Sequence, residues 1–243
     1  MNEKEIFLKA EEWLAKGLDL AVITVVETWG SSPRPVGSSM IVNSQNNSIG
    51  SVSGGCIESF VFSKSLEVIK KGGYQVLEFG VTNTQAWEAG LTCGGKIKVL
   101  VEKFSLKDLP IIKKINNIFN TSGKLVISTN LSSGERKVIA HDKNYRVIDS
   151  KILDTEISKV ASIKGIDWFH KVFTSQYKII IIGAVHISEP LIDLANILNF
   201  KVFLIDPRNS FDKNKFIKKA ILLNEWPDEG LKQLKIDTKT SIV

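Results

Sequence analysis

Residues 178–188 read KIIIIGAVHIS, and this stretch decides how the second half of the chain is expected to fold. Four isoleucines follow the leading lysine, an apolar run of the kind found in buried strands of parallel sheets. A helical pattern comes next and ends near Phe200, and a second apolar run spans Lys201–Ile205. Asp206 closes that run, where dinucleotide-binding units carry an acidic residue for a ribose. This order predicts a Rossmann-like βαβ unit.

The turn of this unit lacks most of the glycines that a dinucleotide site needs. Three glycines usually let the backbone approach a pyrophosphate here. Only Gly183 fits, because Val185 and Ser188 hold the second and third positions. A β-branched side chain at the second position would crowd the pyrophosphate, so the sequence argues against NAD(P) binding.

Two further strand patterns, residues 220–223 and 240–243, complete the second half. A doubly wound domain normally has five or six strands. We therefore expect residues 175–243 to form a Rossmann-like domain that is incomplete at its carboxyl end. Either this domain is shortened, or another chain completes its sheet.

The first part of the chain mixes helix and strand patterns. Asn2 and Glu5 have the spacing of a capping box at the start of a helix that Gly17 ends. Two more helices are expected, over residues 57–71 and 106–119. Strands are expected over residues 20–27, 40–42, 48–52, 74–79, 96–104, 124–129, 137–141, 145–148 and 168–173.

These patterns define the expected fold class. Residues 151–165 show no clear pattern, and His170, in the last of these strands, is expected to face solvent. The sequence predicts an α/β protein in which a mixed α+β amino-terminal domain, residues 1–174, precedes a partial Rossmann-like parallel βαβ domain, residues 175–243.

Composition limits the classes of function. Hydrophobic residues make up 43% and charged residues 24%, as in ordinary globular proteins. The net charge of +6 comes from scattered lysines without a recognition-module pattern, so we expect no nucleic-acid binding. No apolar run has membrane-spanning length, and the polar start is unlike a signal peptide. With two cysteines that stay reduced, we expect a cytoplasmic protein that does not contact a membrane.

Both cysteines stand beside paired glycines, in GSVSGGC (residues 50–56) and LTCGG (residues 91–95). Glycine pairs let backbone amides come close to a bulky ligand, and a thiolate suits a soft metal or sulfur chemistry. The alternative is two small buried residues at tight turns. Cys56 lies at an expected helix start, where the helix dipole favours a thiolate. It is therefore the better candidate for a reactive thiol, with Cys93 as its supporting partner.

Residues 28–39, TWGSSPRPVGSS, form an unusual loop. Two prolines make it rigid, and the guanidinium of Arg34 together with serine hydroxyls would suit a phosphate or carboxylate. The serines are Ser31, Ser32, Ser38 and Ser39. The alternative is a surface turn with a solvated arginine. Glu58, in the first turn of the next expected helix, either compensates the helix dipole or contacts a ligand.

Three motifs, in this order, resemble the signature of the XdhC/CoxI family, accessory proteins of xanthine dehydrogenase and carbon monoxide dehydrogenase. They are GSSPRP at residues 30–35, GSVSGGCIE at residues 50–58 and LTCGG at residues 91–95. GAVH at residues 183–186 and IDPR at residues 205–208 resemble the family's Rossmann-like second domain. The resemblance covers nearly the whole chain.

The resemblance implies a cofactor chaperone rather than an enzyme. Such proteins bind the molybdenum cofactor (molybdopterin) and support its sulfuration with a cysteine desulfurase. They then deliver it to an apo molybdenum hydroxylase of the xanthine or carbon monoxide dehydrogenase type. We also expect a homo-oligomer. Val185 and the short carboxyl-terminal domain depart from the family pattern.

The resemblance also implies which residues bind the cofactor. They are Ser31, Ser32, Arg34, Ser38, Gly54, Gly55, Cys56, Glu58, Cys93, Gly94 and Gly95. Among these, Cys56 is implied as the molybdenum contact or the carrier of transferable sulfur. Two alternatives stay open: an NAD(P)-dependent oxidoreductase that uses the βαβ unit, and a non-catalytic scaffold completed by a separate chain.

Overall fold

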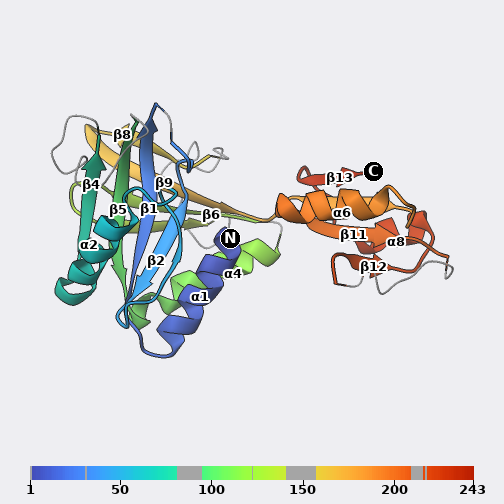
Figure 1. Ribbon diagram of the computed structural model, residues 1–243, viewed down its shortest axis with the longest axis horizontal. Helices are drawn as coiled ribbons and strands as arrows, with labels where there is room; N and C mark the ends of the chain where they lie inside the picture. The colour runs from blue at the N-terminus through green and yellow to red at the C-terminus, as the bar shows by residue number, and fades with distance from the viewer. Residues whose placement is uncertain are drawn as a thin grey trace. The chain divides into compact units, whose positions relative to one another are not determined.

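The computed structural model describes residues 2–30, 32–80, 95–121, 123–140, 157–208, 216 and 218–243. The chain divides into two compact units, Met1–Thr174 and Ser175–Val243. Helices accompany three sheets, of which one is parallel (Figure 1). The predicted α/β fold class is therefore confirmed.

The first unit is built on a five-stranded antiparallel sheet with the order β3-β2-β1-β5-β4. Its strands are β1 (Leu20–Trp29), β2 (Ser39–Asn43), β3 (Ser48–Gly50), β4 (Tyr74–Phe79) and β5 (Lys96–Phe104). Alternate side chains of β1 enter different clusters: Leu20 and Val22 join one, and Ala21 and Ile23 join the other. Because neighbouring side chains in a strand point to opposite faces, both faces of this sheet are covered.

Helices cover the two faces of this sheet. α1 (Glu3–Ala15) and α4 (Leu109–Asn120), with the short 3-10 helix η1 (Leu106–Asp108) before α4, pack in the cluster that contains Leu20. α2 (Glu58–Lys71) packs in the cluster that contains Ile23. The capping box expected at the start of α1 is present: the Glu5 backbone N–H donates to Asn2 Oδ1 at 2.9 Å.

A second antiparallel sheet, with the order β7-β6-β9-β8, belongs to the same unit. Its strands are β6 (Lys124–Asn130), β7 (Arg136–Ala140), β8 (Lys159–Ile163) and β9 (Ile166–Thr174). Within the stretch without a clear pattern, β8 is a strand that the sequence did not predict. The strand predicted over residues 145–148 lies outside the described residues.

The prediction that His170 faces solvent is wrong. Its side chain is 1% exposed, and Nδ1 lies 2.7 Å from the Ser128 Oγ. The reason is topological: β9 lies inside the sheet, where His170 is paired with Ser128 on one side and Lys159 on the other. The sequence pattern of β9 alone does not show that β6 and β8 pair with it on either side.

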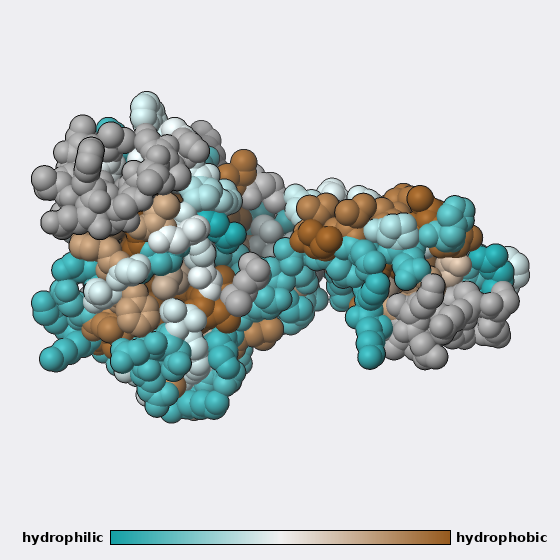
Figure 2. Space-filling view, viewed as in Figure 1, coloured by the Kyte–Doolittle hydropathy of each residue, from teal (hydrophilic) through white to brown (hydrophobic). Residues whose placement is uncertain are grey.

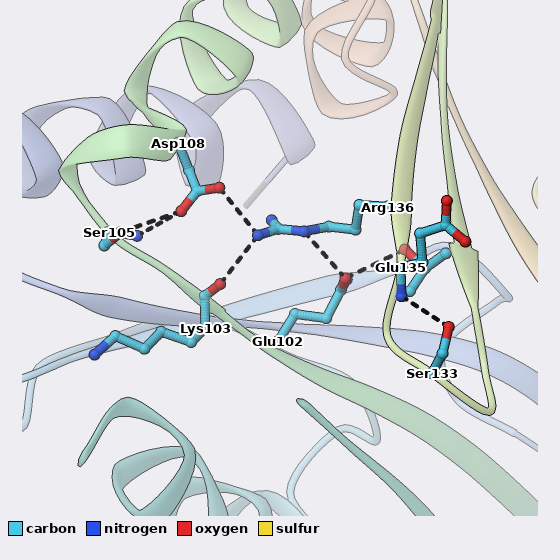
Figure 3. A network of polar contacts seen from close by, with 8 residues as sticks. Glu102, Lys103, Ser105, Asp108, Ser133, Glu135 and Arg136 are labelled. Atoms are coloured by element: carbon cyan, nitrogen blue, oxygen red, sulfur yellow. Dashed lines mark hydrogen bonds and ion pairs between the residues drawn. The ribbon is translucent and has the colours of Figure 1, made fainter. Parts of the chain in front are cut away.

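A buried polar network joins the end of β5 to the start of β7 (Figure 3). Arg136 Nη2 donates to Asp108 Oδ1 at 3.0 Å and to the Lys103 carbonyl oxygen at 3.4 Å. Arg136 Nε lies 3.7 Å from Glu102 Oε1, and the guanidinium sits 4.0 Å from the Phe104 ring centroid. Burial raises the pKa of Glu102, and the charge of Arg136 opposes that rise. The network links the two sheets, and removing one partner would leave a buried charge uncompensated.

The second unit contains a parallel sheet with the order β12-β11-β10-β13. Its strands are β10 (Lys178–Ile182), β11 (Lys201–Ile205), β12 (Ile221–Leu223) and β13 (Thr240–Ile242), and its helices are α6 (Ser188–Ile197) and α8 (Pro227–Gln233). β10, α6 and β11 form the predicted parallel βαβ unit. In the described part of the chain, no helix has the length and apolar character that crossing a membrane requires.

Candidate functional site

The strand register brings the sequence motifs toward one end of the first sheet. β1 ends at Trp29, which is paired with Lys96, the first residue of β5. The GSSPRP loop follows Trp29, and Gly95 of the LTCGG motif immediately precedes Lys96. The two motifs are therefore attached to neighbouring strand ends. Cys93, Gly94 and Ser31 lie outside the described residues.

The loop from residue 30 to residue 38 is fastened to β1. The Gly37 backbone N–H donates to the Val25 carbonyl oxygen at 2.8 Å, and the Val25 N–H donates to the Ser38 carbonyl oxygen at 2.9 Å. Ser32 Oγ donates to the Arg34 carbonyl oxygen at 3.0 Å. The Arg34 Nε is buried and has no hydrogen-bond partner among the described residues. Arg34 is thus a half-buried cation held on a constrained loop.

Not all the serines of this loop face outward. Ser38 is buried, and Ser39 is completely buried at the start of β2. Ser39 Oγ donates to Glu3 Oε2 at 3.1 Å and accepts a hydrogen bond from the Lys171 ammonium. The expectation that Ser39 serves an anionic ligand is therefore wrong, because its hydroxyl is used inside the protein.

The glycine loop before α2 touches the GSSPRP loop. Gly54 and Gly55 have φ angles of 75° and 119°, which favour glycine. A Cβ atom at Gly54 would lie 3.3 Å from Pro33 Cγ, whereas one at Gly55 would meet nothing within 4 Å. The absence of a side chain at Gly54 thus permits the contact between the two loops, and Gly55 leaves open space beside them.

Glu58 organises this glycine loop. The backbone N–H groups of Val52, Ser53 and Gly55 donate to its carboxylate at 3.2, 2.9 and 2.8 Å. Ser51 Oγ donates at 2.7 Å, and Ser53 Oγ donates as well. Burial by itself would raise the pKa of Glu58, but these hydrogen bonds outweigh it and lower the pKa to about 2. The carboxylate is ionised and occupied by its own loop.

Cys56 lies next to this loop. It is half-buried, packs against the cluster beneath α2, and precedes Ile57, the N-cap of that helix. The structure therefore places Cys56 close to the helix start, as expected from the sequence. Groups of three or more histidine, cysteine, aspartate or glutamate side chains that would hold a metal are absent from the described ranges.

A cavity of about 420 Å³ lies at the ends of β1, β4 and β5. Trp29 lines it with 67% of the residue exposed, and the Lys96 ammonium lies 5.8 Å from the Trp29 ring centroid. Lys98 is held by Glu78 at 2.9 Å and Glu27 at 3.3 Å, and Glu78 is the main reason why the pKa of Lys98 is raised. Within the described part of the chain, Lys96 forms no such ion pair.

The sequence motifs do not indicate Trp29 or Lys96 as site residues. Trp29 immediately precedes the GSSPRP loop, and Lys96 immediately follows the LTCGG motif. The signal that joins them is the cross-strand pairing of the two positions. Residues that pair across strands are far apart in the chain, and a local pattern does not reveal which positions face each other.

The acidic residue at the end of β11 is already bonded within the second unit. The Ala184 backbone N–H donates to Asp206 Oδ2 at 2.6 Å, and Arg208 donates through Nη2 at 2.6 Å and through its backbone N–H at 2.8 Å. The Arg208 guanidinium holds the pKa of the buried Asp206 carboxyl well below its usual range. Ser188 Oγ closes the turn by donating to the Gly183 carbonyl oxygen at 2.6 Å.

Comparison with known proteins bears on the family resemblance of the motifs. Residues 13–80 match the model of the XdhC and CoxI family. This range includes the GSSPRP and GSVSGGCIE motifs. The resemblance to the XdhC and CoxI family is therefore confirmed.

Two curated relatives and one solved structure extend the comparison. The molybdenum cofactor insertion chaperone PaoD of Escherichia coli (strain K12) is 28% identical over 117 residues, which are 48% of this chain and 36% of PaoD. A probable xanthine dehydrogenase subunit from Bacillus subtilis (strain 168) is 23% identical over 225 residues, covering 88% of this chain and 68% of the relative.

The solved structure is described as a xanthine dehydrogenase from Bacillus halodurans. It matches with a TM-score of 0.77 and 21% identity, over 97% of this chain and 73% of that chain. At this identity, the match shows that the two chains share a fold.

Proposed function

We propose that this protein is a maturation factor that binds the molybdenum cofactor and delivers it to a xanthine dehydrogenase-type molybdenum hydroxylase. The observation that carries the proposal is the meeting of the GSSPRP loop and the glycine loop at Gly54 and Pro33. Both loops lie in the segment that matches the family. The relative PaoD, a molybdenum cofactor insertion chaperone by name, supports the same role.

The residues present fit such a cofactor, which carries a phosphate, a pterin and a dithiolene-bound metal. Arg34 offers a buried donor without a partner in the described residues, which suits a phosphate. The open space beside Gly55 suits a bulky ring. The cavity of about 420 Å³ falls in the range of small-molecule sites, roughly 300–1,000 Å³, and lies at the end of β1 that leads into the GSSPRP loop. Arg34, Gly55 and Cys56 are not among the residues that line it.

In this proposal each group has a definite task. Arg34 holds the anionic end, and Ser32 positions it by donating to its carbonyl oxygen. The exposed ring of Trp29 offers a stacking surface for the flat part of the ligand. Lys96, which lies over that ring, adds a positive charge. The Cys56 thiol contacts the metal or carries sulfur, for which a cysteine desulfurase is the donor. When bound, the cofactor supplies a thiophilic metal centre.

The other predicted site residues either position the loops or contact the cofactor. Glu58 acts as a positioning residue, because its carboxylate is occupied by the N–H groups of residues 52, 53 and 55. Cys93, Gly94 and Ser31 keep their proposed contact with the cofactor, as does Gly95, which immediately precedes β5. Ser38 is buried, so its contribution is made through the backbone that it shares with β1.

We assign cofactor binding to residues 1–174 and regard residues 175–243 as a Rossmann-like domain that does not bind NAD(P). Support for the second assignment comes from Asp206, whose carboxylate accepts hydrogen bonds from Ala184 and Arg208. A ribose would have to displace both donors. We further propose that the protein works in the cytoplasm as a homo-oligomer with an apo hydroxylase and a cysteine desulfurase as partners.

The test is the cofactor content of protein purified from a host that makes molybdopterin. Oxidation of the denatured protein releases a fluorescent pterin, which is quantified against protein. We expect pterin with the wild type and less with Cys56→Ala. The proposal would be overturned if the purified protein contained no pterin although the host's own molybdoenzymes contained their cofactor. An unchanged pterin content in Cys56→Ala would show that the Cys56 thiol is not part of the binding site.

A further inference from the structure

The two loops of the proposed cofactor site share a point of attachment, Ser39. The GSSPRP loop ends there, because β2 begins at Ser39. The glycine loop is attached there as well, since the Ser51 backbone N–H donates to the Ser39 carbonyl oxygen at 3.2 Å. The two chain segments come so close that a Cβ atom at Gly50 would lie 2.4 Å from this oxygen. Both loops are therefore fixed to the backbone of one residue.

A buried cation holds the side chain of Ser39. The ammonium of Lys171, in β9, donates a hydrogen bond to the Ser39 Oγ. Glu3, in the first turn of α1, contacts both groups: its Oε2 lies 3.1 Å from the Lys171 Nζ and accepts a hydrogen bond from the Ser39 Oγ at 3.1 Å. Three elements that are far apart in the chain therefore meet at one hydroxyl group.

Lys171 is buried, which is unusual for a lysine. Figure 2 shows hydrophilic residues on the outer surface of the first unit, over the lower ends of α1 and α2 in that view. Lys171 instead is 6% exposed, and its Nζ lies 5.0 Å from the ring centroids of both Phe7 and Phe173. Burial lowers the pKa of Lys171, and the charge of Glu3 opposes that change. The ammonium therefore depends on Glu3 and the two rings to stay charged inside the protein.

Stability alone does not explain this buried ion pair. Replacing a buried ion pair by apolar side chains of similar volume is often neutral or stabilising. A lysine at residue 171 therefore points to a specific contact, and the contact that it makes is with the Ser39 hydroxyl.

The next residue of β9 supports the same loop. The Val172 backbone N–H donates to the Ser158 Oγ at 3.0 Å. A Cβ atom at Gly37 would lie 2.8 Å from that Oγ, and the φ angle of Gly37 is 92°, so glycine lets the loop lie directly on Ser158. Two successive residues of β9 thus support the end of the GSSPRP loop, one through Ser158 and one through Ser39.

We propose that Lys171 is a positioning residue for the cofactor site, acting through Ser39 with Glu3 as its partner. The inference rests on the proposed function of the two loops. It places part of the support of the site outside residues 13–80, the segment that matches the family. Loops that are held in their binding geometry lose less freedom when a ligand binds. Loss of the Lys171 contact should therefore weaken cofactor binding without removing a group that touches the cofactor.

The test begins with hydrogen–deuterium exchange of the full chain without cofactor, in the wild type, Lys171→Met and Ser39→Ala. Lys171→Met removes the charge and keeps an unbranched side chain, and Ser39→Ala removes only the hydroxyl group. In both variants we expect the two loops, residues 30–38 and 51–57, to exchange about tenfold faster, because they open more often. The affinity for molybdenum cofactor released from a molybdoenzyme should fall by about the same factor, since only the closed loops bind it.

Two controls separate this role from a general loss of stability. Arg136→Met also removes a largely buried cation of the first unit, but one that is bonded to Asp108 and to the Lys103 carbonyl oxygen, near the opposite end of β5 from the loops. Ser65→Ala removes the hydroxyl of another completely buried serine, which donates to the Val61 carbonyl oxygen within α2. Both controls should match the wild type in loop exchange and in cofactor affinity.

Three results would overturn the inference. The first is unchanged loop exchange in either Lys171→Met or Ser39→Ala. The second is faster loop exchange with unchanged cofactor affinity, and the third is equally fast loop exchange in Arg136→Met. If Lys171→Met does not fold, Ser39→Ala decides, because it leaves the ion pair between Lys171 and Glu3 in place.

The same measurements separate this inference from the proposed function. A wild type that binds no added cofactor would overturn both. Loop exchange that still depended on Lys171 would then show that the failure lies in the proposed cofactor and not in the support of the loops.

Discussion

Both units contain a glycine turn that is closed by a carboxylate, yet the two turns leave different groups for a ligand. In the first unit Glu58 gathers the N–H groups of residues 52, 53 and 55, while Arg34 on the adjacent loop keeps a buried donor unused within the described residues. In the second unit Asp206 is bonded to Arg208. The carboxylate thus orders the first turn without bonding to Arg34. In the second turn, the carboxylate is already paired with Arg208.

The difference teaches that a turn motif is not enough to place a binding site. Both turns follow a strand and precede a helix. What separates them is whether a cation remains for an anionic ligand once the turn has satisfied its own backbone. This criterion is the reason why we propose the first unit, and not the second, as the ligand-binding part of the chain.

The largest expected effect is on cofactor affinity, and it is tested by replacing one arginine in each unit with alanine. Arg34→Ala should lower the affinity for the molybdenum cofactor roughly 10- to 100-fold, because a hydrogen bond to a charged group contributes about 1.5–3 kcal/mol. Arg208→Ala, in the second unit, should leave the affinity unchanged. The measurement is pterin retained after purification, followed by titration. An equal loss of cofactor affinity in both variants would contradict the proposed difference between the two turns.

The next effect concerns the carboxylate of the first turn. Glu58→Ala should lower the free energy of unfolding by roughly 2–3 kcal/mol, because several loop N–H groups lose their acceptor. Glu67→Ala is the matched control, since Glu67 pairs with Lys64 and Lys71 on the surface of the same helix and should change stability by less than about 1 kcal/mol. Thermal or urea unfolding distinguishes them.

The same carboxylate predicts a pH dependence. The pKa of Glu58 is lowered from 4.5 to about 2 in the folded protein. Its stabilising contribution is therefore complete above its ordinary pKa and is lost as the pH falls toward the folded value. The wild type should lose more stability than Glu58→Gln between pH 5 and pH 3, roughly the window in which the unfolded carboxyl takes up its proton. Parallel curves for the two proteins would contradict this role.

A smaller effect is expected at the exposed tryptophans. Trp29 is 67% exposed and Trp226 is 66% exposed, so they form a matched pair with one member in each unit. Trp29→Ala should weaken cofactor binding about 2- to 10-fold, as expected for loss of a stacking contact of about 0.5–1.5 kcal/mol. Trp226→Ala should bind like the wild type. Fluorescence titration of each variant reports which ring the ligand quenches.

The smallest effect is expected from a single methyl group. Gly54→Ala and Gly72→Ala both place a side chain at a positive φ angle, which costs about 1–2 kcal/mol. Only at Gly54 does the new Cβ meet another loop, at 3.3 Å from Pro33 Cγ. Gly54→Ala should therefore also reduce cofactor retention a few-fold. Equal retention by the two variants would show that contact between the loops is not required.

Local signals predicted most of the fold. The capping box at Asn2 and Glu5 and the apolar run of β10 depend on neighbours within a few residues, and both are present in the structure. The sequence does not predict β8, because its Lys159–Ile163 segment, KVASI, is short and partly exposed. The local sequence does not predict the burial of His170, because that burial depends on β6 and β8, which pair with β9 from elsewhere in the chain.

The candidate site was predicted in part. The glycines and Arg34 stand out in short motifs by residue type alone, so the sequence indicates them directly. The pairing of Trp29 with Lys96 and the contact of Gly54 with Pro33 arise from the folded sheet. The occupation of Glu58 by its own loop requires the chain to turn back on itself, which a linear pattern does not show.

The most direct test of the central claim is hydrogen–deuterium exchange of the purified chain with and without molybdenum cofactor released from a molybdoenzyme. The account predicts that added cofactor slows exchange in residues 30–38 and 51–57 and leaves residues 183–188 unchanged. Protection at residues 183–188, with residues 30–38 and 51–57 unaffected, would contradict it.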